Sequence, residues 1–152
     1  MANWLNLGEM VKLNAKKYPG AVCLMDRDRS YTFPQTNERA CKLADALASM
    51  GLQKGDRISV LLENCTEFVE IYLAAAKAGL VVNPINFRLT PQEVGYIAKH
   101  AESRAFIVHD EFCPTVDAIR AELSIKRGRY VVVGQPRLDP AGLRQGQGAA
   151  PG

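Results

Sequence analysis

The first third of the chain shows the hydrophobic period of amphipathic helices on either side of a short alternating segment. A first helix is predicted before residues 19–20, where Pro-Gly ends it. Residues 21–32 then have the strand, turn and strand pattern of a hairpin. The apolar residues near one face of the first helix are Leu7, Met10, Val11 and Leu13.

A capping box marks the start of the second predicted helix at Thr32. Thr32 and Gln35, three residues apart, can each satisfy a free backbone N–H group of the other. Pro34 stands in the first turn, where its missing donor does no harm. Gly51 stands where a left-handed terminator belongs. The apolar stripe of this helix consists of Ala40, Leu43, Ala44, Leu47 and Met50.

From Arg57 onward, short apolar runs alternate with helical patterns. Buried strands are predicted at 57–62, 80–84, 104–110 and 129–134, separated by helices at 67–79, 92–101 and 113–123. Strands that alternate with helices through short connectors pair in parallel. The sequence therefore predicts an α/β fold, a mostly parallel sheet flanked by helices, with a helix and a hairpin before it.

Two further helix starts have capping signals. Thr90, Pro91 and Glu93 provide a cap, a proline in the first position and a glutamate in the third. Asn64 is predicted to cap the helix before it, with Glu67 in the third position. Beyond Gly134 the chain is rich in Gly, Pro, Gln and Ala, so residues 136–152 are predicted to be a disordered tail.

Composition narrows the possible functions. The chain has 47% hydrophobic residues, a net charge of +3 and no run of five like charges, so nucleic-acid binding is not expected. There is no apolar run near the roughly 18 residues of a membrane span, and no signal-peptide pattern, so we expect a cytoplasmic protein. Its four cysteines lack metal-site spacing and are interpreted as reduced and structural.

The usual loops of phosphate-binding and hydrolytic sites are missing. The sequence contains no G-x-G-x-x-G, no G-x-x-x-x-G-K-[ST] and no G-x-S-x-G. His100 and His109 are interpreted as structural or solvated. Asp110 and Glu111 follow a predicted parallel strand, where carboxylates can bind a ligand or cap the next helix. We favour the cap.

The order and spacing of these segments resemble one enzyme family. Residues 31–108, with the opening segment before them, are similar to the N-terminal part of adenylate-forming enzymes, closest to the acyl-CoA synthetases. The resemblance covers residues 5–135, the expected N-terminal portion of an AMP-binding domain. It implies that ATP, Mg²⁺ and a carboxylic acid, fatty-acid-like in the nearest relatives, give an acyl-adenylate and pyrophosphate. Coenzyme A then displaces AMP.

The resemblance also implies one binding residue. Arg88, in the corner Asn-Pro-Ile-Asn-Phe-Arg, matches an arginine that in relatives can lie near the phosphates of coenzyme A; the alternative is a structural salt bridge. The family's phosphate loop, which ends in Pro-Lys-Gly, does not follow residues 129–134. We therefore expect a truncated chain that is inactive alone, has no catalytic or metal-binding residue, and binds none of ATP, Mg²⁺ and coenzyme A tightly.

Alternative functions remain open. The chain could be a non-catalytic binding or dimerisation module, a possible homodimer, or a pseudogene product. A receiver-like or flavodoxin-like domain is less well supported, because receivers need an acidic cluster with a phosphorylatable Asp and only Asp110–Glu111 approaches one.

Overall fold

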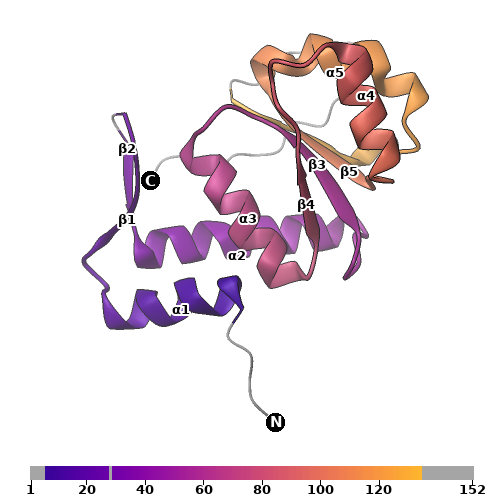
Figure 1. Ribbon diagram of the computed structural model, residues 1–152. Helices are drawn as coiled ribbons and strands as arrows, with labels where there is room; N and C mark the ends of the chain where they lie inside the picture. Colours follow the sequence, from indigo (N-terminus) through magenta and orange to yellow (C-terminus); the bar gives the residue numbers. More distant parts are fainter. Residues whose placement is uncertain (1–5, 28, 135–152) are drawn as a thin grey trace. The chain divides into compact units, whose positions relative to one another are not determined.

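The computed structural model describes residues 6–27 and 29–134, and these form two compact units (Figure 1). The first unit includes the chain up to residue 54 together with residues 64–80. The second includes residues 55–63 and the chain from residue 81 onward. The predicted tail at 136–152 lies outside the described residues.

The first unit is a three-helix layer with a hairpin. It consists of α1 (Leu7–Lys17), β1 (Val22–Asp26), β2 (Arg29–Thr32), α2 (Phe33–Ser49) and α3 (Thr66–Ala78). The strands β1 and β2 pair antiparallel, which confirms the predicted hairpin. The capping box of α2 is present as predicted, with the Thr32 N–H group 2.8 Å from Gln35 Oε1.

The predicted inner face of α1 is mostly wrong. Only Val11 of the four apolar residues is buried, and it packs with Ala40 of α2 and Leu73 of α3. The buried side of α1 passes through Gly8, where an added Cβ would lie 2.8 Å from the Lys77 side chain. The helix therefore approaches its neighbours along Gly8 and Val11. The other three apolar side chains, Leu7, Met10 and Leu13, stay 43–48% exposed.

The predicted cap of α3 is also wrong. Cys65, not Asn64, is the capping residue, and its side chain makes no capping hydrogen bond. Glu67 therefore occupies the second helical position, and its carboxylate binds Arg29 of β2. The end of α3 agrees with the prediction, because Gly79 adopts the left-handed conformation there (φ +70°).

The second unit contains the parallel sheet that the sequence predicts. Its strands are β3 (Arg57–Leu61), β4 (Val81–Pro84), β5 (Ala105–His109) and β6 (Tyr130–Val133), in the order β4-β3-β5-β6 and all parallel. The helices are α4 (Pro91–His100) and α5 (Cys113–Ile119), with 3₁₀ turns η1 (Asp110–Phe112), η2 (Arg120–Glu122) and η3 (Arg127–Arg129).

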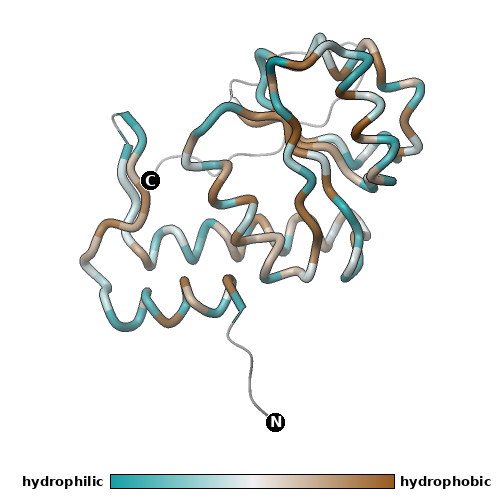
Figure 2. Tube along the Cα trace, viewed as in Figure 1, coloured by the Kyte–Doolittle hydropathy of each residue, from teal (hydrophilic) through white to brown (hydrophobic). Residues whose placement is uncertain are grey.

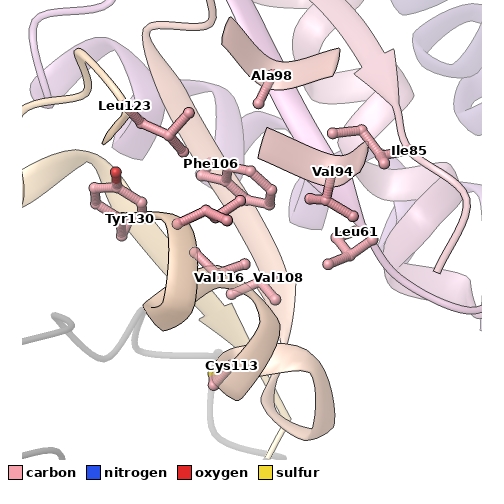
Figure 3. Packing of buried hydrophobic residues seen from close by; sticks show 11 residues of the cluster. Leu61, Ile85, Val94, Ala98, Phe106, Val108, Cys113, Val116, Leu123 and Tyr130 are labelled. Carbon is pink, nitrogen blue, oxygen red and sulfur yellow. The ribbon is translucent and has the colours of Figure 1, made fainter. Parts of the chain in front are cut away.

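Helices α4 and α5 cover one face of this sheet. Figure 3 shows their side chains, including Val94 and Val116, meeting Phe106 and Val108 of β5. The opposite face, with Ile58, Val60, Ala105 and Ile107, is buried as well, as expected for a parallel sheet. Strand β4 is less buried than predicted, because it lies at the sheet edge and leaves Val81 exposed.

Candidate functional site

The carboxyl ends of the parallel strands carry the candidate site. After β4 the chain forms the corner at residues 85–88, and after β5 it forms the turn η1. Strand ends of this kind share one edge of a sheet, where ligands bind in open α/β folds. We call Asn86, Phe87, Arg88, His109 and Phe112 the corner cluster.

Asn86 fixes the backbone of the corner. Its side-chain oxygen accepts a hydrogen bond from the Arg88 N–H group (3.0 Å), and its carbonyl accepts one from the Leu89 N–H group (3.2 Å). This is the turn that asparagine side chains stabilise. The capping box of α4 follows at once, with the Thr90 N–H group 2.8 Å from Glu93 Oε2. Arg88 therefore stands between two fixed turns.

The capping box also affects an ionisable group. The backbone hydrogen bond from Thr90, with a second from its hydroxyl group, lowers the pKa of Glu93. Glu93 therefore stays charged as the cap of α4. Thr90, Pro91 and Glu93 confirm the predicted helix start.

An aromatic stack supports Arg88. The Phe87 and Phe112 rings stack with centroids 5.5 Å apart, and the His109 ring lies 6.3 Å from Phe112. The Arg88 guanidinium carbon lies 5.6 Å from the centre of the Phe87 ring. Arg88 is exposed, and no carboxylate among the described residues lies within ion-pair distance of it. The salt-bridge alternative for Arg88 therefore gains no support.

The two acidic residues after β5 contact a histidine. His109 Nδ1 lies 2.9 Å from Asp110 Oδ1 and 3.2 Å from Glu111 Oε1. The predicted cap of α5 is wrong, because Phe112 is the capping residue there and its side chain makes no hydrogen bond. His109 accepts from the Glu111 N–H group instead and caps the turn η1 (3.5 Å).

The end of β6 approaches the same turn. Gly134 has φ +117°, and a Cβ atom there would lie 2.8 Å from the Asp110 carboxyl carbon. Only glycine fits this conformation and this contact. Asp110 thus lies against the backbone at the end of the neighbouring strand.

His100 lies outside the corner cluster. It is exposed at the end of α4 and stacks on Tyr96 with centroids 5.9 Å apart. A shallow apolar depression borders this part of α4, and Leu89, the residue after Arg88, lies on its rim. Its lining residues are Leu89, Gln92, Glu93, Tyr96 and Ile97.

The sequence missed most of the corner cluster. Asn86, Phe87 and Phe112 were not singled out, although two of them directly follow β4 and one follows β5. Their position after parallel strands was the available signal. Their mutual stacking was not predictable, because it depends on how α5 and the corner approach each other.

Several kinds of site gain no residues. Within residues 6–27 and 29–134, no three His, Cys, Asp or Glu side chains gather as metal ligands. No helix in the same ranges is long and apolar enough to cross a bilayer. The four cysteines are free thiols, and burial raises the pKa of Cys65 to about 11, so this thiol is unreactive at neutral pH.

Charge pairs in the first unit are structural. Arg39 of α2 binds Glu70 of α3 through both carboxylate oxygens, and Arg29 binds Glu67 in the same way. Burial alone would raise the pKa of Glu67, but the hydrogen bonds from Arg29 and the backbone outweigh it and lower the pKa to about 2.

The comparison with known families gives one clear match. The model of the AMP-binding enzyme family matches residues 11–150. A long-chain-fatty-acid–CoA ligase of Mycobacterium tuberculosis, FadD13, is 36% identical over 119 residues, which are 77% of this chain and 24% of the ligase. A peroxisomal butyrate–CoA ligase of Arabidopsis thaliana is 31% identical over 109 residues, 72% of this chain and 19% of that protein.

Solved structures agree with the sequence matches. The anthranilate–CoA ligase AuaEII has a TM-score of 0.85 at 27% identity, over 92% of this chain and 27% of the ligase. The N-terminal domain of FACL13 from Mycobacterium tuberculosis has a TM-score of 0.77 at 31% identity, over 84% of this chain and 33% of that structure. The chain thus spans about a quarter of the first relatives' length. The chain belongs to the family of AMP-binding enzymes and corresponds to the N-terminal part of its acyl-CoA ligases.

Proposed function

We propose that the chain supplies the N-terminal part of an ATP-dependent acyl-CoA synthetase that acts on a fatty-acid-like carboxylic acid. The family match over residues 11–150 carries this proposal, and the relatives named as fatty-acid and butyrate ligases support the substrate class. The reaction joins acid and ATP to an acyl-adenylate, which coenzyme A converts to a thioester. We propose a cytoplasmic location as well.

Arg88 is the residue of this chain that we assign to coenzyme A. A guanidinium group binds a phosphate through paired hydrogen bonds. Three observations support the assignment: Arg88 is exposed, no described carboxylate neutralises it, and Asn86 and Phe87 hold its backbone and side chain. A ligand phosphate would therefore meet a positioned charge, without first displacing an ion pair.

The remaining machinery has no counterpart among the described residues. They offer no cluster of carboxylates for Mg²⁺, so we route no step of the reaction through that ion here. We propose that the chain alone does not form the adenylate and binds ATP, Mg²⁺ and coenzyme A weakly at most. Pyrophosphate exchange with ATP and a panel of fatty acids is expected to stay at the blank level. Exchange above the blank would refute this part of the proposal.

A titration with adenosine 3′,5′-bisphosphate, the nucleotide end of coenzyme A, tests the role of Arg88. Amide NMR signals of residues 85–90 are expected to shift in the millimolar range and to stay unshifted in Arg88→Ala. The matched control is Arg104→Ala, which removes an exposed arginine that precedes β5 and should keep the response. Equal responses in both variants would refute the assignment.

A second pair of variants tests how Arg88 is positioned. Asn86→Ala removes the acceptor of the Arg88 N–H group, whereas Asn86→Ser keeps a side-chain oxygen that can form the same kind of turn. We expect Asn86→Ala to weaken the titration severalfold and Asn86→Ser to restore most of it. Loss of binding in both variants would point to a general disturbance of the corner.

A further inference from the structure

Helix α1 has an exposed apolar stripe that the fold of the first unit does not use. Leu7, Met10 and Leu13 lie three residues apart and are 43–48% exposed, whereas Val11 and Gly8 form the packed side. Figure 2 shows hydrophobic positions interleaved with hydrophilic ones along α1. Burying these side chains in the protein would have been favourable, so their exposure on one stripe marks a candidate interaction surface.

The charges on the same helix identify the kind of partner. Its exposed residues include Lys12, Lys16 and Lys17 against one acidic residue, Glu9, which lies 3.7 Å from the Lys12 ammonium group. The other strongly exposed apolar residue of this unit, Met25, lies on the hairpin beside Asp26 and Arg27, without such an excess of lysine. The α1 stripe alone combines apolar side chains with a net positive charge.

This combination suits an anionic lipid surface. An amphipathic helix with lysines at its polar margin lies in the membrane interface, where its apolar residues enter the headgroup boundary and its lysines attract acidic lipids. Long lysine side chains can reach the phosphates while their methylene groups stay against the apolar residues. Lys17 follows the stripe and already lies over the Tyr18 ring (5.2 Å).

We propose that the face of α1 formed by Leu7, Met10 and Leu13, with Lys12, Lys16 and Lys17, docks the protein on an anionic membrane surface. The proposal concerns peripheral contact, not insertion across the bilayer. It does not depend on the proposed ligase activity or on Arg88, so either can fail alone. A complementary protein surface, including a second copy of the chain, is the competing partner that the test must separate.

Flotation of the 152-residue chain with vesicles tests the proposal, because aggregated protein does not float. We expect binding to vesicles of phosphatidylcholine with 30% phosphatidylserine and much weaker binding to phosphatidylcholine alone. The sequence has a single tryptophan, Trp4, just before the Asn6 cap of α1. Its emission should shift to shorter wavelength with the anionic vesicles only.

Two sets of variants locate the contact. Lys12→Gln, Lys16→Gln and Lys17→Gln together should weaken vesicle binding by about fivefold per lysine. Met10→Gln with Leu13→Gln should weaken it on the order of tenfold, since both side chains would leave the apolar boundary. Because all five side chains are exposed, the variants should melt at the temperature of the parent chain.

Matched controls carry the same changes elsewhere. Lys42→Gln, Lys99→Gln and Lys126→Gln remove three exposed lysines of α2, α4 and the segment before η3, and Met25→Gln removes the exposed methionine of the hairpin. These controls should bind vesicles as the parent does. Equal loss in the controls would mean that net charge alone drives binding, and it would overturn the assignment to α1.

Two other results would also overturn the proposal. One is the absence of flotation with anionic vesicles. The other is self-association in sedimentation velocity that Met10→Gln with Leu13→Gln abolishes, together with vesicle binding that these variants leave intact. That second result would make the stripe a protein contact.

Discussion

The pair between Arg39 and Glu70 gives the sharpest stability prediction. Glu70 of α3 is nearly buried, with 6% of its side chain exposed, and Arg39 of α2 keeps 27%. The guanidinium Nε lies 2.5 Å from Oε1 and Nη2 lies 3.2 Å from Oε2, and the Tyr31 ring covers its face at 4.6 Å. The hydrogen bond from Glu70 raises the pKa of Arg39 above its ordinary value.

Glu70→Gln would leave the Arg39 charge half-buried and without its partner. Removing one member of a fully buried pair costs about 3–5 kcal/mol, and an exposed pair contributes about 0–1 kcal/mol. Because a quarter of Arg39 still meets water, we expect a loss of about 2–3 kcal/mol. That is a large part of the roughly 5–15 kcal/mol that stabilises a typical domain, and it should lower Tm by about 5–10 °C.

Urea unfolding followed by circular dichroism measures this loss. The double variant Arg39→Met with Glu70→Met should recover much of it, because an apolar pair carries no desolvation cost. Glu38→Gln is the matched control: it removes an exposed glutamate of α2 that pairs with Lys42 four residues on, and it should leave the unfolding curve unchanged. A Glu70→Gln curve that overlays the parent curve would refute the reasoning.

Three further predictions concern other local features. The pKa of Glu67 lies near 2 when folded, below the ordinary 4.5, so its pairing with Arg29 should stabilise the protein above about pH 4.5 and be lost as the pH falls towards 2; in Glu67→Gln this acid-dependent part of the Tm curve should be absent. Thr90→Ala should cost about 1 kcal/mol in urea unfolding and Thr90→Ser much less, since serine also caps helices; equal losses would contradict the cap. Gly79→Ala should cost about 1 kcal/mol because its φ is +70°, while Gly20→Ala, in open space, should be neutral in the same assay.

The sequence predicted best where the cause of a structure is local. The capping boxes at Thr32 and Thr90 and the terminator at Gly79 rely on residues within one turn of each other, and all three are confirmed. The parallel sheet is confirmed for a related reason, since alternating strands and helices leave few ways to pair.

The predictions failed where tertiary contacts decide. Asn64 has the right side chain for a cap, but Glu67 binds Arg29, a partner 38 residues away that local patterns do not reveal. The stripe of α1 was predicted to face inward from its spacing, yet Gly8 allows a closer approach than Leu7 or Met10 would. Both misses involve residues distant in sequence.

The candidate site divides in the same way. Arg88 was found through a resemblance, and its exposed position after β4 agrees with that choice. Phe112, which carries the stacking partner for Phe87, comes from a separate strand end, so only the fold brings the two rings together. The support of the site therefore depends on topology more than on any short motif.

The central claim is that this chain is the N-terminal part of an acyl-CoA synthetase. The most direct test is the mass of the product in its native cells, detected with an antibody against residues 1–130. The account predicts a band several times heavier than 16.7 kDa, since the chain spans only 24% of the FadD13 ligase. A single band at 16.7 kDa would contradict it and would direct the search for function towards binding.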